Sequence, residues 1–486
     1  MIAAVEMTIG GMPVGLQEVQ VGPVAPARLE LIIGQERAAR FEAAAAATRS
    51  FLGDRVVFNV NSTAAGGGVA ELLQTLLASV GGVGIEARWL VIEGDAEFFA
   101  ITKRIHNHLY GTPGDGGDLG PLEHERYQET LAANARELVD LVRPGDVVLL
   151  HDPQTAGLAP YLAGAGVGLV WRCHVGLDTP NEHSQRGWNF LRRYLEDVPA
   201  FVFSCEQFAP PWLPRDRVFV IPPSIDPFSA KNEALSEADV GLTLQMVGLL
   251  QGGTGRSPGP FSRRDGSFGQ VGRPVDLVGT GPPPPADVPV VLQASRWDAL
   301  KDMPGVMTGF AHNLADMGAA HLVLAGPSVD GVADDPEAAA VLGECLTLWG
   351  ALPASARARI HLACISMSDS DEAASVVNAL QRHAAVVTQK SLAEGFGLTV
   401  TEAMWKARPV IGSAVGGIVD QIIPGETGYL LADPADLATF AGRVATLLAD
   451  PAEADRMGRN GWQQASERFL GDRHLQQWAQ VLTQLG

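Results

Sequence analysis

Residues 390–405 read KSLAEGFGLTVTEAMW, a loop of small residues that runs directly into a helix. The apolar run just before it, Ala385–Thr388, predicts a buried strand, so the stretch predicts one strand–loop–helix unit of a parallel α/β sheet. Gly395 and Gly397 lack a Cβ atom, which lets the backbone around Phe396 approach a ligand closely and adopt positive φ angles. The fold class and the first candidate site therefore come from the same stretch.

The helix of this unit begins at Leu398 and Thr399. Their amides lack intrahelical acceptors, and together with the helix dipole they favour a phosphate group. Glu394 precedes them, whereas Glu402 lies more than one turn inside the helix, where a carboxylate suits hydroxyl groups better than a second anion. The pattern predicts a sugar-nucleotide site with phosphate at the helix start, ribose at Glu402 and hexose at Glu394. The alternative is a tight loop that only caps an amphipathic helix.

A second candidate segment, SRWDALKD at 295–302, follows the apolar run Val288–Ala294. Arg296 and Lys301 lie just beyond the end of this predicted strand, where open α/β sheets bind ligands. Two fixed cations there could balance the charge of a diphosphate that leaves during a reaction. The alternative is that both are ordinary surface charges.

Short apolar runs alternate with helical stretches along most of the chain, which is typical of parallel α/β sheets. In the first half the predicted strands are residues 56–60, 88–92, 146–150, 168–172, 200–204 and 218–221. In the second half they are residues 288–294, 321–325, 360–363, 385–388, 409–412 and 428–431. We therefore expect an α/β protein whose two Rossmann-like domains face each other across a cleft.

The prolines of IPPSIDP interrupt this rhythm and place a domain boundary there, between an N-terminal domain of residues 1–221 and a C-terminal domain of residues 222–473. Residues 251–287 are rich in Gly, Pro and Ser, a composition that cannot bury enough apolar surface to order a segment. We expect a flexible surface insertion there, with the Arg263–Arg264 pair in solvent. A lid or an oligomer contact are the alternatives.

Composition excludes several classes of protein. The 486 residues exceed what one hydrophobic core usually serves, and the 46% hydrophobic and 19% charged residues are those of a soluble globular protein. The formal charge of -20 argues against nucleic acid or an anionic membrane as the main partner. The four cysteines form no CxxC pair, so neither a zinc site nor a disulfide framework is predicted. With no secretory signal and no membrane-spanning run recognisable, we expect a cytoplasmic protein.

Gly66, Gly67 and Gly68 lie between a predicted strand and a predicted helix, an order that lets backbone amides face an anion. A dinucleotide-binding dehydrogenase is the rival hypothesis from another class, but the G-x-G-x-x-G spacing is missing, and no acidic residue follows a clear second strand about twenty residues later. A glycosidase is disfavoured too. Eight helical residues separate Glu394 from Glu402 by ~12 Å, beyond the ~5.5 Å of a retaining pair.

Two patterns that could suggest a metal have simpler interpretations. The sequence DSD at 369–371 precedes a predicted helix over Glu372–Arg382, so Asp369 is interpreted as its N-cap. His106, His108 and His124 could suggest a metal, but two ring nitrogens without a clear third ligand are weak evidence. We predict no metal site.

Several long segments occur in one order that resembles the retaining glycosyltransferases of family GT4, which have the GT-B fold. The segments in the second half are SRWDALKD, EGFGLTVTE and SAVGGIVDQI. In the first half four further segments resemble the trehalose synthases of this family, which join a nucleoside-diphosphate glucose to free glucose. These are FNVNSTAAGGGVAELLQTL (58–76), FFAITKRIHNHLYG (98–111), LLHDPQTAGL (149–158) and WRCHVGLDTPN (171–181).

The resemblance implies a retaining glucosyltransferase that makes α,α-trehalose from UDP- or ADP-glucose and glucose. It implies catalytic roles for Glu394, Arg296, Lys301 and His174. The implied donor-binding residues are Gly66, Gly67, Gly68, Arg296, Lys301, Gly395, Phe396, Gly397, Leu398, Thr399 and Glu402. The implied acceptor-binding residues are His151, Asp152, Gln154, Asp178 and Lys103. A last helix, residues 474–486, is expected to cross back onto the first domain.

The expected partners are small sugars and a nucleotide, with no nucleic acid and no membrane. No tightly bound cofactor is expected, although Mg²⁺ could stimulate the reaction. Whether the protein forms a homodimer is left open. A trehalose phosphorylase, which uses phosphate and yields glucose 1-phosphate, is the nearest alternative. A GT4 transferase with a different acceptor comes next, and a noncatalytic sugar-binding protein is the third alternative.

Overall fold

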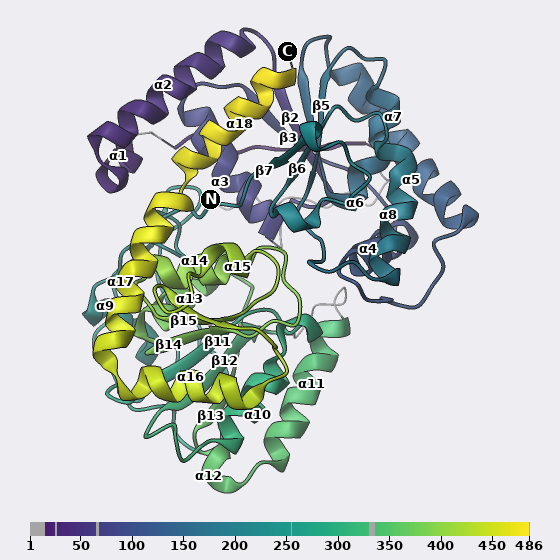
Figure 1. The fold of residues 1–486 in the computed structure, drawn as a ribbon. Helices are drawn as coiled ribbons and strands as arrows, with labels where there is room; N and C mark the ends of the chain where they lie inside the picture. Colours follow the sequence, from purple (N-terminus) through teal and green to yellow (C-terminus); the bar gives the residue numbers. More distant parts are fainter. Residues whose placement is uncertain (1–14, 25–26, 65–67, 254, 330–335, 486) are drawn as a thin grey trace, which may run out of the picture.

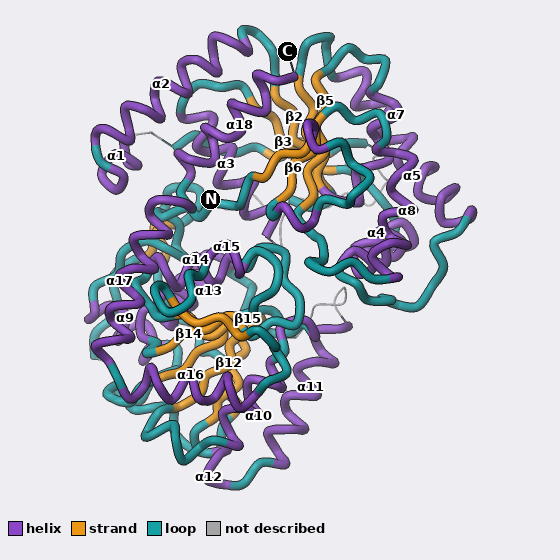
Figure 2. Tube along the Cα trace, viewed as in Figure 1, coloured by secondary structure: helices purple, strands orange, loops and turns teal. Residues whose placement is uncertain are grey.

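The computed structural model describes residues 15–24, 27–64, 68–253, 255–329 and 336–485. Figure 1 shows two lobes connected by the yellow helices near the end of the chain, and Figure 2 shows an orange sheet inside each lobe. The first lobe is built on strands between residues 17 and 220, and the second lobe on strands between residues 261 and 431. The expectation of an α/β protein with two Rossmann-like units is confirmed.

The sheet of the first lobe has the order β1-β3-β2-β4-β5-β6-β7 within the described residues. Its strands are β1 (Gln17–Val19), β2 (Val57–Asn61), β3 (Ala87–Val91), β4 (Val147–His151), β5 (Gly168–Cys173), β6 (Ala200–Phe203) and β7 (Val218–Val220). All neighbours are parallel except β1, which pairs antiparallel with β3. Every strand predicted in this half is present, and only the edge strand β1 was not predicted.

The sheet of the second lobe has the order β10-β13-β12-β11-β14-β15-β16 within the described residues. Its strands are β10 (Asp276–Val278), β11 (Val290–Ala294), β12 (His321–Pro327), β13 (Ile360–Ile365), β14 (Val386–Gln389), β15 (Val410–Ser413) and β16 (Gly428–Leu431). Again all predicted strands are present, and the antiparallel edge strand β10 was missed. The strand order reverses between β2 and β4 in one sheet and between β11 and β14 in the other, where ligands bind in open α/β sheets.

Helices cover both faces of each sheet, which is why β2 and β4 are buried along their whole length. The first lobe holds α1 (Ala27–Ile33), α2 (Gln35–Leu52), α3 (Gly68–Gly82), α4 (Ala96–Leu109), α5 (Pro121–Leu141), α6 (Asp152–Thr155), η1 (Ala156–Leu158), α7 (Ala159–Leu162), α8 (Glu182–Leu195), η2 (Glu206–Phe208) and η3 (Arg215–Arg217). The second lobe holds α9 (Glu237–Met246), η4 (Ala299–Lys301), α10 (Met303–His312), α11 (Pro336–Ala351), α12 (Ala354–Arg357), α13 (Ser370–His383), α14 (Leu398–Trp405), α15 (Ile418–Gln421), α16 (Leu437–Ala449) and α17 (Pro451–Arg468). In the part of the chain that is described, no helix is both long and apolar enough to span a bilayer.

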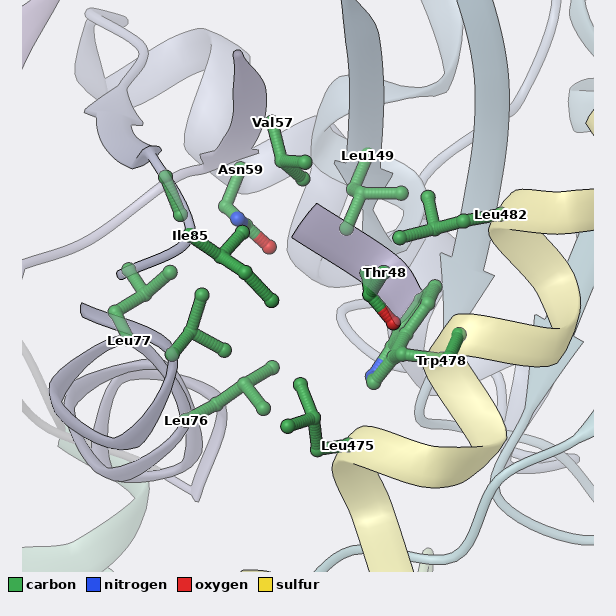
Figure 3. A pocket seen from close by; sticks show the side chains of 13 residues that line it. Thr48, Val57, Asn59, Leu76, Leu77, Ile85, Leu149, Leu475, Trp478 and Leu482 are labelled. Atoms are coloured by element: carbon green, nitrogen blue, oxygen red, sulfur yellow. The ribbon is translucent and has the colours of Figure 1, made fainter. Parts of the chain in front are cut away.

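The last helix, α18 (Gly471–Leu485), leaves the second lobe after α17 and packs on the first lobe (Figure 1). Its apolar face joins the core between the first sheet and α2, and Asp472 forms an ion pair with Arg37 of α2. A cavity of about 40 Å³ lies where α18 meets α3 and β2 (Figure 3). Leu475, Trp478 and the mostly apolar side chains opposite them line it, so α18 forms part of the first lobe's core.

The expectation that residues 251–287 bury little apolar surface is wrong. This segment forms the hairpin β8 (Phe261–Ser262) and β9 (Phe268–Gly269), and β10 extends the main sheet. Phe261 is only 1% exposed. Arg263 donates both terminal nitrogens to the carboxylate of Asp369, at 2.9 and 2.6 Å, so the arginine pair is not simply solvated. Phe261, Val271 and Val275 of the segment join the core of the second lobe. Its residues Arg263, Arg264 and Arg273 form ion pairs with the acidic residues at the start of α13.

The acidic turn of α13 also tests the interpretation of DSD at 369–371. The Asp369 side chain accepts hydrogen bonds from the amides of Asp371 and Glu372, at 3.2 and 3.1 Å. Asp369 is therefore the N-cap of α13, as predicted.

Candidate active site

The second lobe places Glu394 and Lys301 in direct contact. Glu394 lies in the loop after β14, and Lys301 ends the short turn η4 after β11. The Lys301 ammonium donates to both carboxylate oxygens of Glu394, at 2.8 and 2.7 Å. Ser391 donates a further hydrogen bond to Glu394 Oε2 at 3.1 Å. The sequence placed both residues at the site but did not anticipate that they form an ion pair.

Buried polar residues beneath this pair hold its two loops together. Gln293 at the end of β11 donates from its side-chain nitrogen to the Lys301 carbonyl at 2.7 Å, and its side-chain oxygen accepts from the Lys390 amide at 3.0 Å. The Lys390 side chain is fully buried and forms an ion pair with Asp302. Asp302 adopts a left-handed backbone with φ 48°, a conformation that Asp tolerates better than most residues. One amide side chain therefore fixes the loops after β11 and β14 relative to each other.

The start of α14 lies beside the start of α3 from the first lobe. Gly397 precedes α14 with φ 82°, which favours a residue without a Cβ atom. Thr399 in the first turn donates to the side-chain oxygen of Gln389 at 2.8 Å. A Cβ atom on Gly68, the first residue of α3, would lie 3.8 Å from Leu398 Cδ1. The two helix N-termini, both favourable to anions, thus meet at the boundary of the lobes. Gly66 and Gly67 lie outside the described residues.

Glu402 is buried one turn further along α14. Its Oε1 lies 3.1 Å from the ammonium of Lys231, and its Oε2 is buried without a hydrogen-bond partner among the described residues. Lys231 also approaches Glu71 of α3 at 3.5 Å. Lys231 was not singled out from the sequence, because it follows a proline-rich stretch with no recognisable pattern.

Arg296 is about half exposed and donates to Asp298 at 2.7 Å. Tyr110, at the end of α4 in the first lobe, lies near Arg296. Burial raises the pKa of Tyr110 well above its usual value, the nearby carboxylates of Glu394 and Asp152 act in the same direction, and Arg296 opposes them. Tyr110 therefore lies close to charged groups of both lobes, a placement that FFAITKRIHNHLYG did not reveal by itself.

The first lobe contributes Asp152 and His174, from the ends of β4 and β5. Asp152 adopts φ 63° and accepts from the His174 amide at 2.7 Å and from its Nδ1 at 3.1 Å. Burial opposes ionisation of Asp152, but the contacts with His174 outweigh it and lower the pKa of Asp152 to about 2. Burial also lowers the pKa of His174. A neutral ring that donates from Nδ1 leaves Nε2 as an acceptor, and Nε2 is buried without a partner among the described residues.

His151 stacks on His174, with ring centroids 5.6 Å apart and planes at 10°. Its Nε2 lies 3.1 Å from the side-chain oxygen of Asn59 in β2, and burial lowers the pKa of His151 well below its usual value. Gln154 lies in α6, partly buried, and Lys103 is exposed on α4, one turn before His106. Among the described residues, no hydrogen bond joins Lys103 or Gln154 to Asp152 or His174.

Asp178 and Gly395 connect the lobes. The Asp178 carboxylate accepts from the Gly416 amide of the second lobe at 2.7 Å. A Cβ atom on Gly395 would lie 2.7 Å from the His174 carbonyl oxygen and 2.9 Å from the Tyr110 hydroxyl, closer than real Cβ atoms come. The loop that carries Glu394 therefore packs directly on the first lobe beside His174, and only glycine fits at this contact.

We call Arg296, Lys301, Glu394 and Glu402 the second-lobe half-site, and Tyr110, His151, Asp152 and His174 the first-lobe half-site. Each lies at the strand ends where its own sheet reverses order, and the two adjoin at Gly395. Within the residues that the structure describes, no three His, Cys, Asp or Glu side chains are grouped so as to hold a metal ion.

Family models match segments of both lobes. The family model "Trehalose synthase, N-terminal domain" matches residues 59–210, and "Glycosyl transferases group 1" matches residues 367–464. The trehalose synthase of Pyrococcus horikoshii is 32% identical over 94% of this chain and 95% of the relative, and that of Rubrobacter xylanophilus is 34% identical over 95% and 97%.

A solved α,α-trehalose-phosphate synthase (UDP-forming) from Burkholderia vietnamiensis has the same fold, with a TM-score of 0.65 and 16% identity over 88% of this chain and 98% of that one. The two facing Rossmann-like lobes are thus a GT-B architecture. Together with the matches over both lobes, this shows that the chain belongs to the trehalose synthase family of GT4 glycosyltransferases.

Proposed function

We propose that the protein transfers glucose from UDP- or ADP-glucose to the anomeric hydroxyl of a second glucose, with retention, and releases α,α-trehalose and the nucleoside diphosphate. The observation that carries this proposal is the packing of Gly395 on His174 and Tyr110. It puts the charged second-lobe half-site next to the polar first-lobe half-site, so a donor held by one can meet an acceptor held by the other.

The donor would bind to the second-lobe half-site. Lys301, Arg296 and the amides at the start of α14 supply positive charge for the diphosphate. Glu394 would bind hydroxyl groups of the transferred glucose. Glu402 is suited to the ribose, because its buried Oε2 has no partner among the described residues.

The reaction needs the bond between the anomeric carbon and the diphosphate oxygen to break while a bond to the acceptor oxygen forms on the same face. In this proposal the leaving phosphate oxygen takes the acceptor's proton, so no covalent enzyme intermediate is formed. Negative charge grows on that oxygen as the bond breaks. Lys301 and Arg296 would stabilise it, and fixed charges of this kind are usually a large catalytic term.

The acceptor would bind to the first-lobe half-site. His174 Nε2 can accept a hydrogen bond from a sugar hydroxyl, because the ring donates its proton from Nδ1 to Asp152. His151, Gln154, Asp178 and Lys103 are proposed to complete the acceptor side. In the structure the Asp178 carboxylate is engaged with Gly416, so a direct contact with sugar would use its remaining lone pairs. No resident cofactor is part of this proposal, and Mg²⁺ would serve only as a counter-ion of the diphosphate.

A trehalose phosphorylase remains the competing function. Inorganic phosphate carries no ribose, so a phosphorylase has no use for a buried carboxylate such as Glu402. This difference favours the nucleotide-dependent transfer.

Incubation with UDP-, ADP- or GDP-glucose plus glucose tests the proposal. We expect a nucleoside diphosphate and a non-reducing disaccharide that an α,α-trehalase cleaves. Trehalose plus phosphate without nucleotide should yield no glucose 1-phosphate. The opposite pair of results would establish the phosphorylase, and a product other than trehalose would establish a different acceptor.

A further inference from the structure

One ammonium group contacts carboxylates of both lobes. Lys231 lies in the segment between β7 and α9, and its Nζ is 3.1 Å from Glu402 Oε1 and 3.5 Å from Glu71 Oε2. Glu402 belongs to α14 of the second lobe, and Glu71 lies in the first turn of α3 of the first lobe. These are the two helices whose N-termini meet at Gly68 and Leu398.

A second lysine lies near Glu402 but does not bind its carboxylate. Lys406, one turn later on α14, donates to the side-chain oxygen of Asn232 at 2.9 Å and to the Glu402 carbonyl at 3.1 Å. Burial lowers the pKa of Lys406 well below its usual value, although Glu402 opposes this. Lys406 therefore binds neutral acceptors and is not the cation that pairs with the Glu402 carboxylate.

Lys231 is the cation that pairs with the Glu402 carboxylate. Burial acts to lower the pKa of Lys231, but the carboxylates of Glu402 and Glu71 outweigh it and raise the pKa. The other charged groups around this cluster are Arg382 of α13, which acts on Lys406, and Arg264 of the β8–β9 hairpin, which acts on Glu71. Of the charged side chains described around Glu402, Lys231 is the cation paired with its carboxylate.

The geometry points to Lys231 as a positioning residue for nucleotide binding. Its ammonium binds Oε1 of Glu402 at 3.1 Å and leaves Oε2, which has no partner among the described residues, available to a ribose hydroxyl. This inference rests on the ribose role proposed for Glu402. It goes beyond that role because Lys231 acts through Glu402 and also connects it to α3 of the first lobe.

Removal of the ammonium has a consequence that a purely structural contact would not have. A buried carboxylate without a cation favours its protonated form, which has lost one acceptor oxygen and part of its strength as an acceptor. In Lys231→Met, nucleotide affinity should therefore fall as the pH is lowered and recover as the pH is raised. The terminal phosphate of UDP and ADP itself titrates near the low end of this range, with a pKa of about 6, so each variant is compared with the wild type at the same pH. The ratio of the two affinities should stay constant wherever a cation remains beside Glu402.

Calorimetric titration of UDP and ADP into the full-length protein between pH 6 and pH 8.5 tests this. Lys231→Met should bind about tenfold more weakly than wild type at pH 6 and recover most of that loss at pH 8.5, a change of about 1.4 kcal/mol. For Lys231→Arg, the ratio of nucleotide affinity to that of wild type should be constant over this pH range. Glu71→Gln is the matched control: it removes the other carboxylate but leaves the Lys231–Glu402 pair, so its affinity ratio should also be constant. If Lys231→Met does not melt cooperatively, Lys231→Gln replaces it in the same titration.

Glu402→Gln separates the two levels of inference. Unchanged nucleotide affinity in Glu402→Gln overturns the proposed ribose role. Weakened affinity in Glu402→Gln, together with Lys231→Met or Lys231→Gln profiles that parallel the wild type, overturns the role of Lys231 alone.

Discussion

The two half-sites hold a carboxylate against a nitrogen in different ways. In the second lobe Glu394 is paired with Lys301, which comes from a loop 93 residues away. In the first lobe Asp152 is paired with His174, a ring whose pKa is lowered by burial, only 22 residues away. The second-lobe half-site thus contributes two cations, Arg296 and Lys301, whereas in the first-lobe half-site the charge of Asp152 is engaged by His174, whose Nε2 is left as a neutral acceptor. This difference matches a charged leaving group on one side and uncharged sugar hydroxyls on the other.

The largest expected effect comes from Lys301 of the second-lobe half-site. Lys301→Ala should slow glucosyl transfer about a hundredfold, a loss of ~3 kcal/mol of transition-state stabilisation. The reason is that Glu394 loses its partner and the departing diphosphate loses a fixed charge. Steady-state kcat with saturating donor measures it. Near wild-type turnover in a protein that melts cooperatively would remove Lys301 from the mechanism.

The contact between the half-sites gives the next largest effect. Gly395→Ala would place a Cβ atom against the His174 carbonyl and the Tyr110 hydroxyl, so the Glu394 loop must shift. We expect transfer to slow about thirtyfold, since a displacement of reacting groups by about 1 Å can cost a hundredfold. Gly343→Ala in α11 is the control, because its Cβ atom would meet nothing within 4 Å. Equal rates for the two variants would show that the half-sites do not depend on this contact.

The first-lobe half-site should respond more weakly. Asp152→Asn removes the charge but tolerates the left-handed backbone, because Asn adopts positive φ readily. The rate should fall about tenfold, the value of one hydrogen bond to a charged group. A fall as large as that of Lys301→Ala would contradict the different roles given to the two half-sites.

The same variant predicts a pH dependence of stability. The folded pKa of Asp152 is lowered to about 2, so its ionised form stabilises the fold above the unfolded value of 3.8 and this contribution is lost as the pH falls through about 2. The shift corresponds to about 2 kcal/mol. Urea unfolding at pH 7 should therefore show wild type as more stable than Asp152→Asn by roughly that amount, and the difference should shrink below pH 4. A difference independent of pH would assign it to packing.

A residue remote from both half-sites should change stability alone. Phe261→Ala in the β8–β9 hairpin should lower the free energy of unfolding by about 3 kcal/mol, since this ring is fully buried. Phe268→Ala, in the same hairpin with a ring that is 74% exposed, should change it by less than about 0.5 kcal/mol. Denaturant titration compares them. Equal stability of the two variants would restore the expectation of an insertion that buries little.

The strands could be predicted because parallel strands covered on both faces are continuous apolar runs. β4, VVLLH, and β11, VVLQA, are examples, and candidate site residues follow directly after both strands. The antiparallel edge strands β1 and β10 could not be recognised, since QEV and DLV each carry an acidic residue and form no continuous apolar run such as VFV of β7. The hairpin was missed because composition does not reveal where a single phenylalanine packs.

Within the site, sequence spacing identified Glu394, Lys301 and His174 as candidates but not their partners. The pairs Lys301–Glu394 and Lys390–Asp302 join residues 93 and 88 positions apart, and Lys231 reaches Glu71 over 160 positions. Such pairs depend on how strand ends are placed in three dimensions. No local pattern records them.

Transfer of a labelled glucosyl group tests the central proposal most directly. UDP- or ADP-glucose with ¹³C at the anomeric carbon, incubated with unlabelled glucose, can be followed by NMR. Glucosyl transfer with retention predicts that the label appears in α,α-trehalose, with the nucleoside diphosphate released in equal amount. Label found in free glucose, in a β-linked product, or only in glucose 1-phosphate after addition of phosphate would contradict it.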